Sequence, residues 1–366
     1  MHQPAERLIE VIHGAGAGVR GRRPTLADVA HHAGVSPSTV SRVLNNSAPV
    51  RDEVRGRVFS SITALRYEPP SVRPDVPALQ GSVVLLIPDI LNPYFADIAR
   101  GVQDEAGAGG PMIVLLDTTE DPQREEQLLR AFARQPVGGI IACGSRLPIE
   151  QFVAVRSRYR VPMVVLNRSI RHPEIPCVMA DSENSAYHAT RHLLNLNHTL
   201  IAFIAGPSAA EMAQARRRGI ETALAEAGLT LPPEWSVSSL PNVNGGFMAM
   251  SSLLALPSTD RPTAVIAYND IMALGALHAA RAHRLRVPED ISVVGFDDIA
   301  MAAHANPPLT TVAQPKYRMG RLAMQLLRRM IEGHPSPGEG YTLLESPLVV
   351  RESTGPAPVG GMPGTG

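Results

Sequence analysis

The sequence predicts an α/β protein in which a small helical domain precedes two doubly wound α/β subdomains. Three observations lead to this expectation. Two short helical patterns joined by a glycine-containing turn lie within residues 25–46. From Gly81 onward, apolar runs typical of buried parallel strands alternate with helical patterns in two successive series. The length of 366 residues also exceeds what one ordinary hydrophobic core organises.

The composition places limits on partners and location. Apolar residues make up 44% of the chain, and the formal net charge is zero. Residues 20–67 nevertheless carry eight arginines and three acidic residues, a local net charge of +5, which suits a polyanionic partner. The two cysteines form no metal or disulfide pattern, and we find neither a signal peptide nor an apolar run of membrane-spanning length. We therefore expect a cytoplasmic protein.

The helical domain begins with a helix at residues 26–33. Thr25 precedes this helix as an N-cap, and Gly34 can adopt the left-handed conformation that ends it. Ser36 can cap a second helix, in which Pro37 occupies the first position, where a missing N–H costs nothing. The second helix is apolar toward the first and carries small polar groups and one arginine outside. This pattern predicts a helix-turn-helix whose second helix fits a DNA major groove.

A third helix over residues 49–65 would complete this domain, which we assign to residues 25–67. Residues 1–24 are expected to form a flexible basic leader. Residues 68–80 form a proline-rich linker, in which Pro74 and Pro77 would break a long helix. A stiff extended linker is slightly favoured over a short helix.

The uninterrupted run DVAHHAGVSPSTVSRVLN, from Asp28 to Asn45, resembles the DNA-binding headpiece of the lactose-repressor-type (LacI/GalR) family. The resemblance implies that Ser38 and Arg42 read bases, with Arg42 preferring guanine, while hydroxyl and amide side chains contact phosphates. Pro37 stands where some members carry a base-contacting side chain, so contacts there should be fewer and apolar. The residues expected to contact DNA are Thr25, Ser36, Pro37, Ser38, Thr39, Ser41, Arg42 and Asn45.

The two series of alternating strand and helix patterns after Gly81 predict the individual elements of the core. Predicted strands at 83–87, 112–116, 139–143 and 163–166 alternate with helices at 95–105, 123–134 and 149–158. A second series places helices at 186–195, 216–227, 246–255 and 271–283, with strands at 200–205, 235–240, 264–267 and 292–295. We divide the core, 81–354, into an N-subdomain (81–182 and 313–341) and a C-subdomain (183–312 and 342–354). Residues 355–366 are expected to be a disordered tail.

Polar and aromatic residues follow the predicted strand ends, where ligands of doubly wound sheets bind. Carboxylates, amides and guanidinium groups together can bind a polyhydroxylated ligand, and aromatic rings can stack on a sugar face or on a purine equally well. The core also resembles the LacI/GalR family and the periplasmic sugar-binding proteins that share its fold. The expected effector-binding residues are Asn92, Tyr94, Phe95, Arg168, Arg216, Asn269, Asp297 and Gln314.

The linker is where the chain departs from the family pattern. Members usually carry a hinge helix whose A-R-x-L pattern places a leucine in the minor groove, and the resemblance aligns it with 73–76. Those residues read Arg-Pro-Asp-Val and are followed by Pro77. Val76 remains an alternative apolar wedge.

These observations predict a sequence-specific transcriptional regulator, most simply a repressor, that binds a pseudopalindromic DNA operator as a homodimer. A small polar effector, most simply sugar-like, would bind between the subdomains. A solute-binding transport protein and an enzyme on an α/β scaffold are the rival hypotheses. The headpiece and the missing export signal argue against the first rival. No catalytic, cofactor or metal motif supports the second, so we expect no enzyme activity, no cofactor and no metal site.

Overall fold

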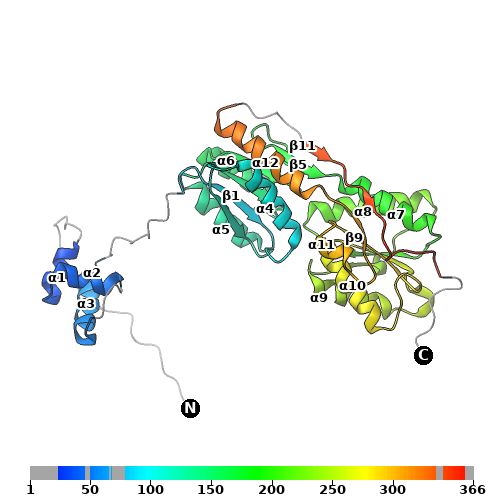
Figure 1. Ribbon diagram of the computed structural model, residues 1–366, viewed down its shortest axis with the longest axis horizontal. Coiled ribbons are helices and arrows are strands. Elements are labelled where there is room, and N and C mark those ends of the chain that lie inside the picture. Colours follow the sequence, from blue (N-terminus) through cyan, green and yellow to red (C-terminus); the bar gives the residue numbers. More distant parts are fainter. Residues whose placement is uncertain (1–23, 46–49, 66, 68–78, 335–340, 359–366) are drawn as a thin grey trace, which may run out of the picture. The chain divides into compact units, whose positions relative to one another are not determined.

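The computed structural model describes residues 24–45, 50–65, 67, 79–334 and 341–358, and the side chains of Leu44 and Asn45 lie outside the described part. The chain divides into two compact units, Met1–Ala78 and Leu79–Gly366. Figure 1 shows both units, which are described separately below. We call them the headpiece and the core.

The headpiece contains three helices, α1 (Leu26–Ala33), α2 (Pro37–Asn45) and α3 (Asp52–Ala64). Thr25 caps α1 as predicted, and Asp28 completes a capping box by accepting the Thr25 backbone N–H at 2.7 Å. Gly34 ends α1 with φ +62°, the left-handed conformation expected of it. The predicted two-helix motif is therefore confirmed.

The headpiece core lies where the three helices meet. Val29, Val40 and Val58, one from each helix, are fully buried there. Tyr67 also packs into this core and donates its backbone N–H to the Ile62 carbonyl at 3.0 Å. The linker residues 68–78 lie outside the described residues, so the predictions for Pro74, Val76 and Pro77 remain open.

The first half of the core is built on a parallel six-stranded sheet with the order β11-β5-β4-β3-β1-β2. Its strands are β1 (Val83–Ile87), β2 (Ile113–Asp117), β3 (Gly139–Cys143), β4 (Met163–Leu166), β5 (Cys177–Ala180) and β11 (Tyr341–Leu344). Leu85 faces one cluster with α4 (Pro93–Ala106) and α12 (Lys316–Ile331). Leu86 faces the other, with α5 (Pro122–Ala133) and α6 (Ile149–Tyr159). This alternation is that of a strand buried on both faces.

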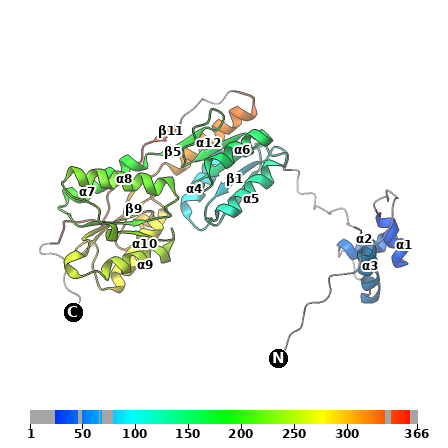
Figure 2. The same ribbon diagram turned by 180° about the vertical axis from the view of Figure 1, so that it is seen from behind.

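The second half is built on another six-stranded sheet, with the order β12-β10-β9-β8-β6-β7. Its strands are β6 (Ile201–Ala205), β7 (Ser236–Ser238), β8 (Ala264–Ala267), β9 (Ser292–Phe296), β10 (Thr310–Val312) and β12 (Leu348–Val349), of which only β12 is antiparallel to its neighbour. The pair α7 (Ser182–Asn195) and α8 (Glu211–Glu226) covers one face, where Phe203 packs. The pair α9 (Val243–Leu254) and α10 (Asp270–Ala282) covers the other, where Ile204 packs (Figure 2).

Three shorter helices complete the described part of the core. They are α11 (Ala300–Ala303), η1 (Pro233–Trp235) and η2 (Ser258–Asp260). No described helix is long and apolar enough to cross a membrane.

The two predicted doubly wound subdomains are confirmed, but some of their boundaries were wrong. β11 pairs with β5 of the first sheet, so the boundary placed after residue 341 has to move beyond Leu344. β5 was not predicted as a strand, and α8 begins at Glu211, five residues earlier than the helix assigned from Arg216.

The prediction that disorder begins at Gly355 is also wrong for residues 355–358. Gly355 is buried, and its carbonyl oxygen lies 3.0 Å from Nε2 of the buried His198. Ala357 donates its backbone N–H to the Leu196 carbonyl at 2.8 Å. Residues 359–366 lie outside the described part.

Candidate functional site

The start of α2 presents a cluster of hydroxyl groups. Ser36 Oγ accepts the Thr39 backbone N–H at 3.2 Å and lies 2.8 Å from the hydroxyls of Ser38 and Thr39. Since the first N–H groups of a helix have no partner within the helix, this end suits an anion such as phosphate. Arg42 lies one turn further along α2 and is exposed.

The other predicted DNA-contacting residues differ in accessibility. Pro37 and Ser38 are exposed, whereas Thr39 and Ser41 are half-buried. The hydroxyl of Thr25 donates to Asp28 Oδ2 at 2.6 Å, so its capping role already uses this group. The Asn45 side chain lies outside the described residues.

The second site is a small cavity of about 50 Å³ between the two halves of the core. It lies where β1, β3, β4, β8 and β9 end, at the carboxyl edges of both sheets. Seven of the eight predicted effector-binding residues line it, namely Asn92, Tyr94, Phe95, Arg216, Asn269, Asp297 and Gln314. Nine further residues, which are not among the predicted effector-binding residues, also line it: Pro88, Asp89, Glu120, Gly144, Arg146, Asn167, Met212, Pro241 and Tyr268.

Arg168 does not line this cavity, and its role in effector binding remains a prediction. Its guanidinium donates instead to the Ser145 carbonyl at 3.1 Å. The preceding residue, Asn167, has a positive φ of 55° and places its amide in the cavity wall. The backbone turn after β4 thus brings Asn167 rather than Arg168 to the cavity wall.

Two predicted ligand residues are also helix caps. Asn92 Oδ1 accepts the Tyr94 N–H at 3.0 Å at the start of α4. Asn269 Oδ1 accepts the Met272 N–H at 2.8 Å at the start of α10. Because capping uses the amide oxygens, the amide N–H groups are what these residues can offer a ligand.

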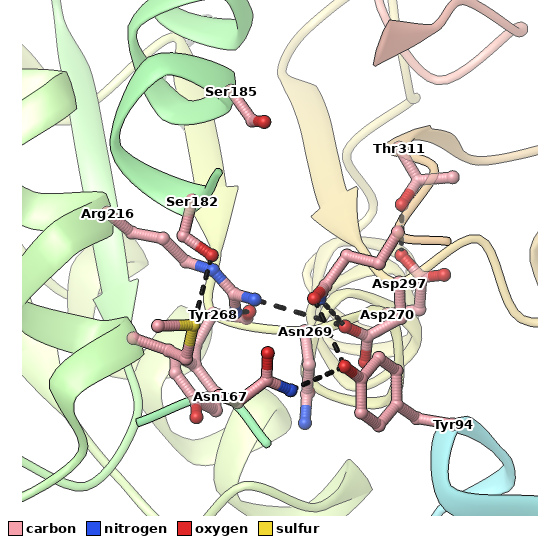
Figure 3. Close-up of polar contacts among 12 residues, drawn as sticks. Tyr94, Asn167, Ser182, Ser185, Arg216, Tyr268, Asn269, Asp270, Asp297 and Thr311 are labelled. Carbon is pink, nitrogen blue, oxygen red and sulfur yellow. Dashed lines mark hydrogen bonds and ion pairs between the residues drawn. The ribbon is translucent and has the colours of Figure 1, made fainter. Parts of the chain in front are cut away.

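A chain of hydrogen bonds joins the two halves of the core across the cavity (Figure 3). Asn167 Nδ2 donates to the Tyr94 hydroxyl at 2.6 Å, and that hydroxyl donates to Gln314 Oε1 at 3.2 Å. Gln314 Nε2 then donates to Asp297 Oδ1 at 2.6 Å. The chain ends at a carboxylate whose Oδ1 lies 4.0 Å from Arg216 Nη2.

Arg216 is held between aromatic rings in the middle of α8. Its guanidinium carbon lies 4.7 Å from the ring centre of Tyr268 and 4.3 Å from that of Phe296. The guanidinium also donates to the Tyr268 carbonyl. Only 2% of Arg216 is exposed, so the rings, the carbonyl and Asp297 together replace its hydration.

Burial makes Asp297 easier to protonate. It raises the pKa of this carboxyl to about 7, against the opposing effects of Arg216, Lys316 and Gln314. Burial likewise raises the pKa of the neighbouring Asp270, which accepts the Ile299 N–H at 2.9 Å and the Thr311 hydroxyl. Asp270 therefore stabilises the turn after β9 and strand β10 next to the cavity and does not line the cavity itself.

A second ion pair lies on the opposite wall. Arg146 Nη2 and Glu120 Oε2 are 2.8 Å apart, and both side chains are largely buried. Glu120 and Thr119 both have positive φ, so the loop after β2 is bent sharply at this point. Both residues of the pair follow strand ends, which is the signal that could have identified them.

Several buried polar atoms in this cavity have no protein partner. They are Asn167 Oδ1, Arg146 Nε and Arg216 Nε. Since buried polar atoms are almost always satisfied, a ligand that brings acceptors to the arginines and a donor to Asn167 would complete the site.

Lys316 supports the site from α12. Its amine donates to the backbone carbonyls of Asp297, at 2.5 Å, and Asp298, at 2.8 Å. Both aspartates have positive φ, of 119° and 52°. The amine also lies 3.6 Å from Asp97 Oδ2 on α4. One buried cation thus holds the turn after β9 against the first half of the core.

Comparison with known proteins adds to this geometry. Residues 25–70 match the model "Bacterial regulatory proteins, lacI family", and residues 190–354 match the model "Periplasmic binding protein-like domain". The HTH-type transcriptional repressor CytR of Escherichia coli (strain K12) is 35% identical over 331 residues, covering 90% of this chain and 96% of CytR. This chain belongs to the LacI family. Its headpiece and core are those of a LacI-family transcriptional regulator that binds DNA and a small effector.

Two solved structures are similar to this chain over most of its length. The complex of the transcriptional regulator CelR with cellobiose has a TM-score of 0.67 and 34% identity, covering 90% of this chain and all of that chain. The lac repressor dimer bound to operator and the anti-inducer ONPF has a TM-score of 0.66 and 28% identity, covering 91% of this chain and all of that chain. The family thus accounts for both sites, one for DNA and one for an effector.

Proposed function

We propose that this protein is a repressor whose operator affinity is set by a neutral, hydroxyl-rich effector bound between the two halves of the core, at the cavity described above, which has to widen to admit it. The observation that carries the proposal is the pairing of charges there. Arg146 faces Glu120 at 2.8 Å, and Arg216 faces Asp297 at 4.0 Å. An anionic effector would have to displace one of these carboxylates, whereas hydroxyl groups can bridge both members of a pair.

The headpiece supports binding to a pseudopalindromic operator, because a dimer would place two copies of α2 on two half-sites. Arg42 and Ser38 would read bases. The hydroxyls of Ser36, Thr39 and Ser41 would position α2 on phosphates, together with Asn45. Thr25 would act chiefly through the stability of α1. Such a role places the protein in the cytoplasm, beside the chromosome.

An exposed apolar stretch at the start of α9 supports a homodimer. Leu240 is 67% exposed, Val243 44% and Met248 66%. Large exposed apolar side chains grouped in this way mark protein interfaces. Met248→Glu should therefore weaken self-association, as measured by analytical ultracentrifugation, and an unchanged association constant would place the interface elsewhere.

A thermal-shift screen of sugars, sugar phosphates and nucleosides tests the effector assignment. We expect neutral sugars or nucleosides to raise the melting temperature and phosphorylated sugars to leave it unchanged. Operator binding should then be measured with the best ligand by fluorescence anisotropy, which shows whether the effector releases or promotes DNA binding. A sugar phosphate that stabilises the protein better than its parent sugar would contradict the proposal.

A further inference from the structure

The C-terminal ends of α5 and α6 carry a group of arginines that neither the helix-turn-helix nor the cavity includes. We call the exposed residues Arg130, Arg134, Arg158 and Arg160 the arginine patch. Arg130 and Arg158 lie in the last turns of the two helices, and Arg134 and Arg160 directly follow their last residues. Both helices pack on the same face of the first sheet (Figure 2), so their ends are neighbours.

Tyr159 joins the two helix ends. Arg134 Nε donates to the Tyr159 hydroxyl at 3.0 Å. The guanidinium carbons of Arg134 and Arg158 lie 5.9 Å and 5.5 Å from the centre of the Tyr159 ring. The hydrogen bond from Arg134 and the nearby charges of Arg134, Arg158 and Arg130 lower the pKa of the hydroxyl from its ordinary value. Three of the four arginines of the patch thus surround one aromatic ring.

Most of this positive charge is not neutralised within the described part of the chain. Arg130 Nη2 lies 2.8 Å from Glu126 Oε1. No described carboxylate forms an ion pair with Arg134, Arg158 or Arg160. Arg160 also has a left-handed backbone, with φ 52°, at a position that favours glycine. Exposed charges of one sign on one surface attract a polyanion.

The arginine patch lies at the edge of the sheet where the chain arrives from the headpiece. Helices that connect parallel strands run back to the amino edge of the sheet, so α5 and α6 both end there. Gly81 donates its backbone N–H to the Pro136 carbonyl at 2.9 Å, and Gly138 donates to the Ser82 carbonyl at 2.8 Å. The segment that leads into β1 is therefore held against the loop that follows Arg134.

The connection to the headpiece is short. Between Tyr67, the last described residue of the headpiece, and Leu79, the chain spans at most about 40 Å in any conformation. DNA rises about 3.4 Å per base pair, so this distance corresponds to roughly one helical turn. DNA that the headpiece holds is therefore within reach of the amino edge of the first sheet.

We propose that the arginine patch is a second DNA-binding surface, which contacts phosphates that flank the operator held by the headpiece. Guanidinium groups bind phosphate oxygens through pairs of N–H donors. Such contacts carry no sequence information, but they add affinity that falls steeply with salt concentration. The inference depends on DNA binding by the headpiece and not on the identity or position of the effector.

The test compares two duplexes in fluorescence anisotropy with the full chain. The short duplex carries only an operator that the full chain has selected from a random library, and the long duplex adds about ten base pairs of unrelated sequence at each end. The natural chain should bind the long duplex at least about fivefold more tightly at about 50 mM salt, and with a steeper salt dependence. Arg158→Gln/Arg160→Gln should reduce this gain to less than about twofold and leave the affinity for the short duplex unchanged.

The chain offers a matched control at the other end of the core. The carboxyl edges of the two sheets meet at the cavity, so the amino edge of the second sheet, where α10 ends, is the far one (Figure 1). Arg281 and Arg284 are exposed there, and Arg284 has a φ of 60°, close to that of Arg160. Arg281→Gln/Arg284→Gln should keep the whole gain. Arg158→Lys/Arg160→Lys preserves the charge and should keep most of it.

Several results would overturn the inference. A gain in Arg158→Gln/Arg160→Gln equal to that of the natural chain would exclude a contact between the patch and the flanks. Absence of any gain in the natural chain would leave the patch to another partner, such as an acidic protein. Equal losses on both duplexes would place the effect within the operator.

Thermal melts separate DNA binding from a purely structural role. Cations at a helix C-terminus stabilise the helix, so Arg158→Gln/Arg160→Gln should lower the melting temperature slightly. A lower melting temperature together with an unchanged gain from the flanks would show that these arginines serve stability alone. The lysine variant then confirms or refutes the role of charge in a chain that keeps the cations at both helix ends.

Discussion

The headpiece and the core use the same kinds of polar side chain in opposite ways. On α2, Ser38 and Arg42 are exposed. In the cavity between the two halves of the core, Arg216, Asp297 and Gln314 are almost completely buried and bonded to one another or to neighbouring groups. Under the proposed function, the headpiece would meet DNA with solvated groups, whereas the core would have to replace existing internal bonds to bind an effector. This difference predicts how each site responds to mutation and pH.

The largest expected effect tests the internal bonding of the core. Asp297→Ala leaves the buried Arg216 guanidinium without a carboxylate partner and removes the hydrogen-bond acceptor of Gln314 Nε2. Loss of one member of a buried charge pair costs about 2–5 kcal/mol. Effector affinity should fall by at least about thirtyfold while operator binding without effector stays normal. Fluorescence anisotropy on labelled operator measures both quantities. Asp104→Ala, on the exposed side of α4, is the control, and a normal effector response in Asp297→Ala would remove this residue from the site.

A smaller effect is expected from the solvated side of the comparison. Arg42→Ala should weaken specific DNA binding by about 1–3 kcal/mol, since it removes a bidentate contact but leaves no buried charge behind. A gel shift at matched salt concentration measures this loss. Arg57→Ala, an exposed cation on α3, should weaken specific and non-specific binding alike. Unchanged operator binding by Arg42→Ala would refute its role as a base reader.

The pH dependence should also separate the two sites. Asp297 has a folded pKa of about 7, above the ordinary aspartate value, so its carboxylate form is populated only as the pH rises through 7. Ligand hydroxyls donate to that carboxylate, so effector affinity should rise between pH 6 and 8, by at most about tenfold per pH unit. Asp297→Asn should flatten the profile in calorimetric titrations. A profile equally steep in this variant would assign the titration to another group.

The same shift affects stability with the opposite sign. A carboxyl whose folded pKa is raised binds more protons in the folded state than in the unfolded state. The contribution of Asp297 to the free energy of unfolding therefore falls as the pH rises from about 4 to about 7. Thermal melts of Asp297→Asn should lack this part of the pH dependence, and melts as steep as those of the natural chain would contradict the assignment.

The smallest expected effect concerns the headpiece alone. Thr25→Ala removes the capping interaction with Asp28 and should destabilise α1 by about 1 kcal/mol. Thr25→Ser keeps the hydroxyl and should restore most of it. Amide hydrogen exchange of α1 measures the change, while protection in the core should remain constant. Equal protection of α1 in Thr25→Ala would show that Asp28 alone is sufficient.

The sequence revealed most where local rules decide the structure. The caps at Thr25 and Ser36, the glycine that ends α1 and the buried strands all follow from neighbouring residues. The rule that ligands bind at strand ends brought seven of the eight predicted effector-binding residues to one cavity, and their role in binding remains a prediction. Arg168 does not line that cavity, because the backbone turn after β4 brings Asn167 there instead.

Contacts between distant segments could not be predicted in this way. β11 joins β5 from more than 160 positions away, and no local pattern specifies that pairing. The bond between Tyr94 and Gln314 spans 220 positions. The Arg146–Glu120 pair joins the loops after β2 and β3, at positions 26 apart in the sequence. Burial and charge pairing are properties of the assembled core, so the raised pKa of Asp297 could not be predicted from the sequence either.

Lys316 has a practical consequence for chemical labelling. It is the only lysine in the chain, and its amine is held between two backbone carbonyls with 8% of its side chain exposed. Amine-specific acylating reagents therefore meet one side-chain target in the whole molecule, and that target reacts only when the turn after β9 releases it. The acylation rate at Lys316, followed by mass spectrometry, would therefore report how often that turn releases the amine, without any introduced label.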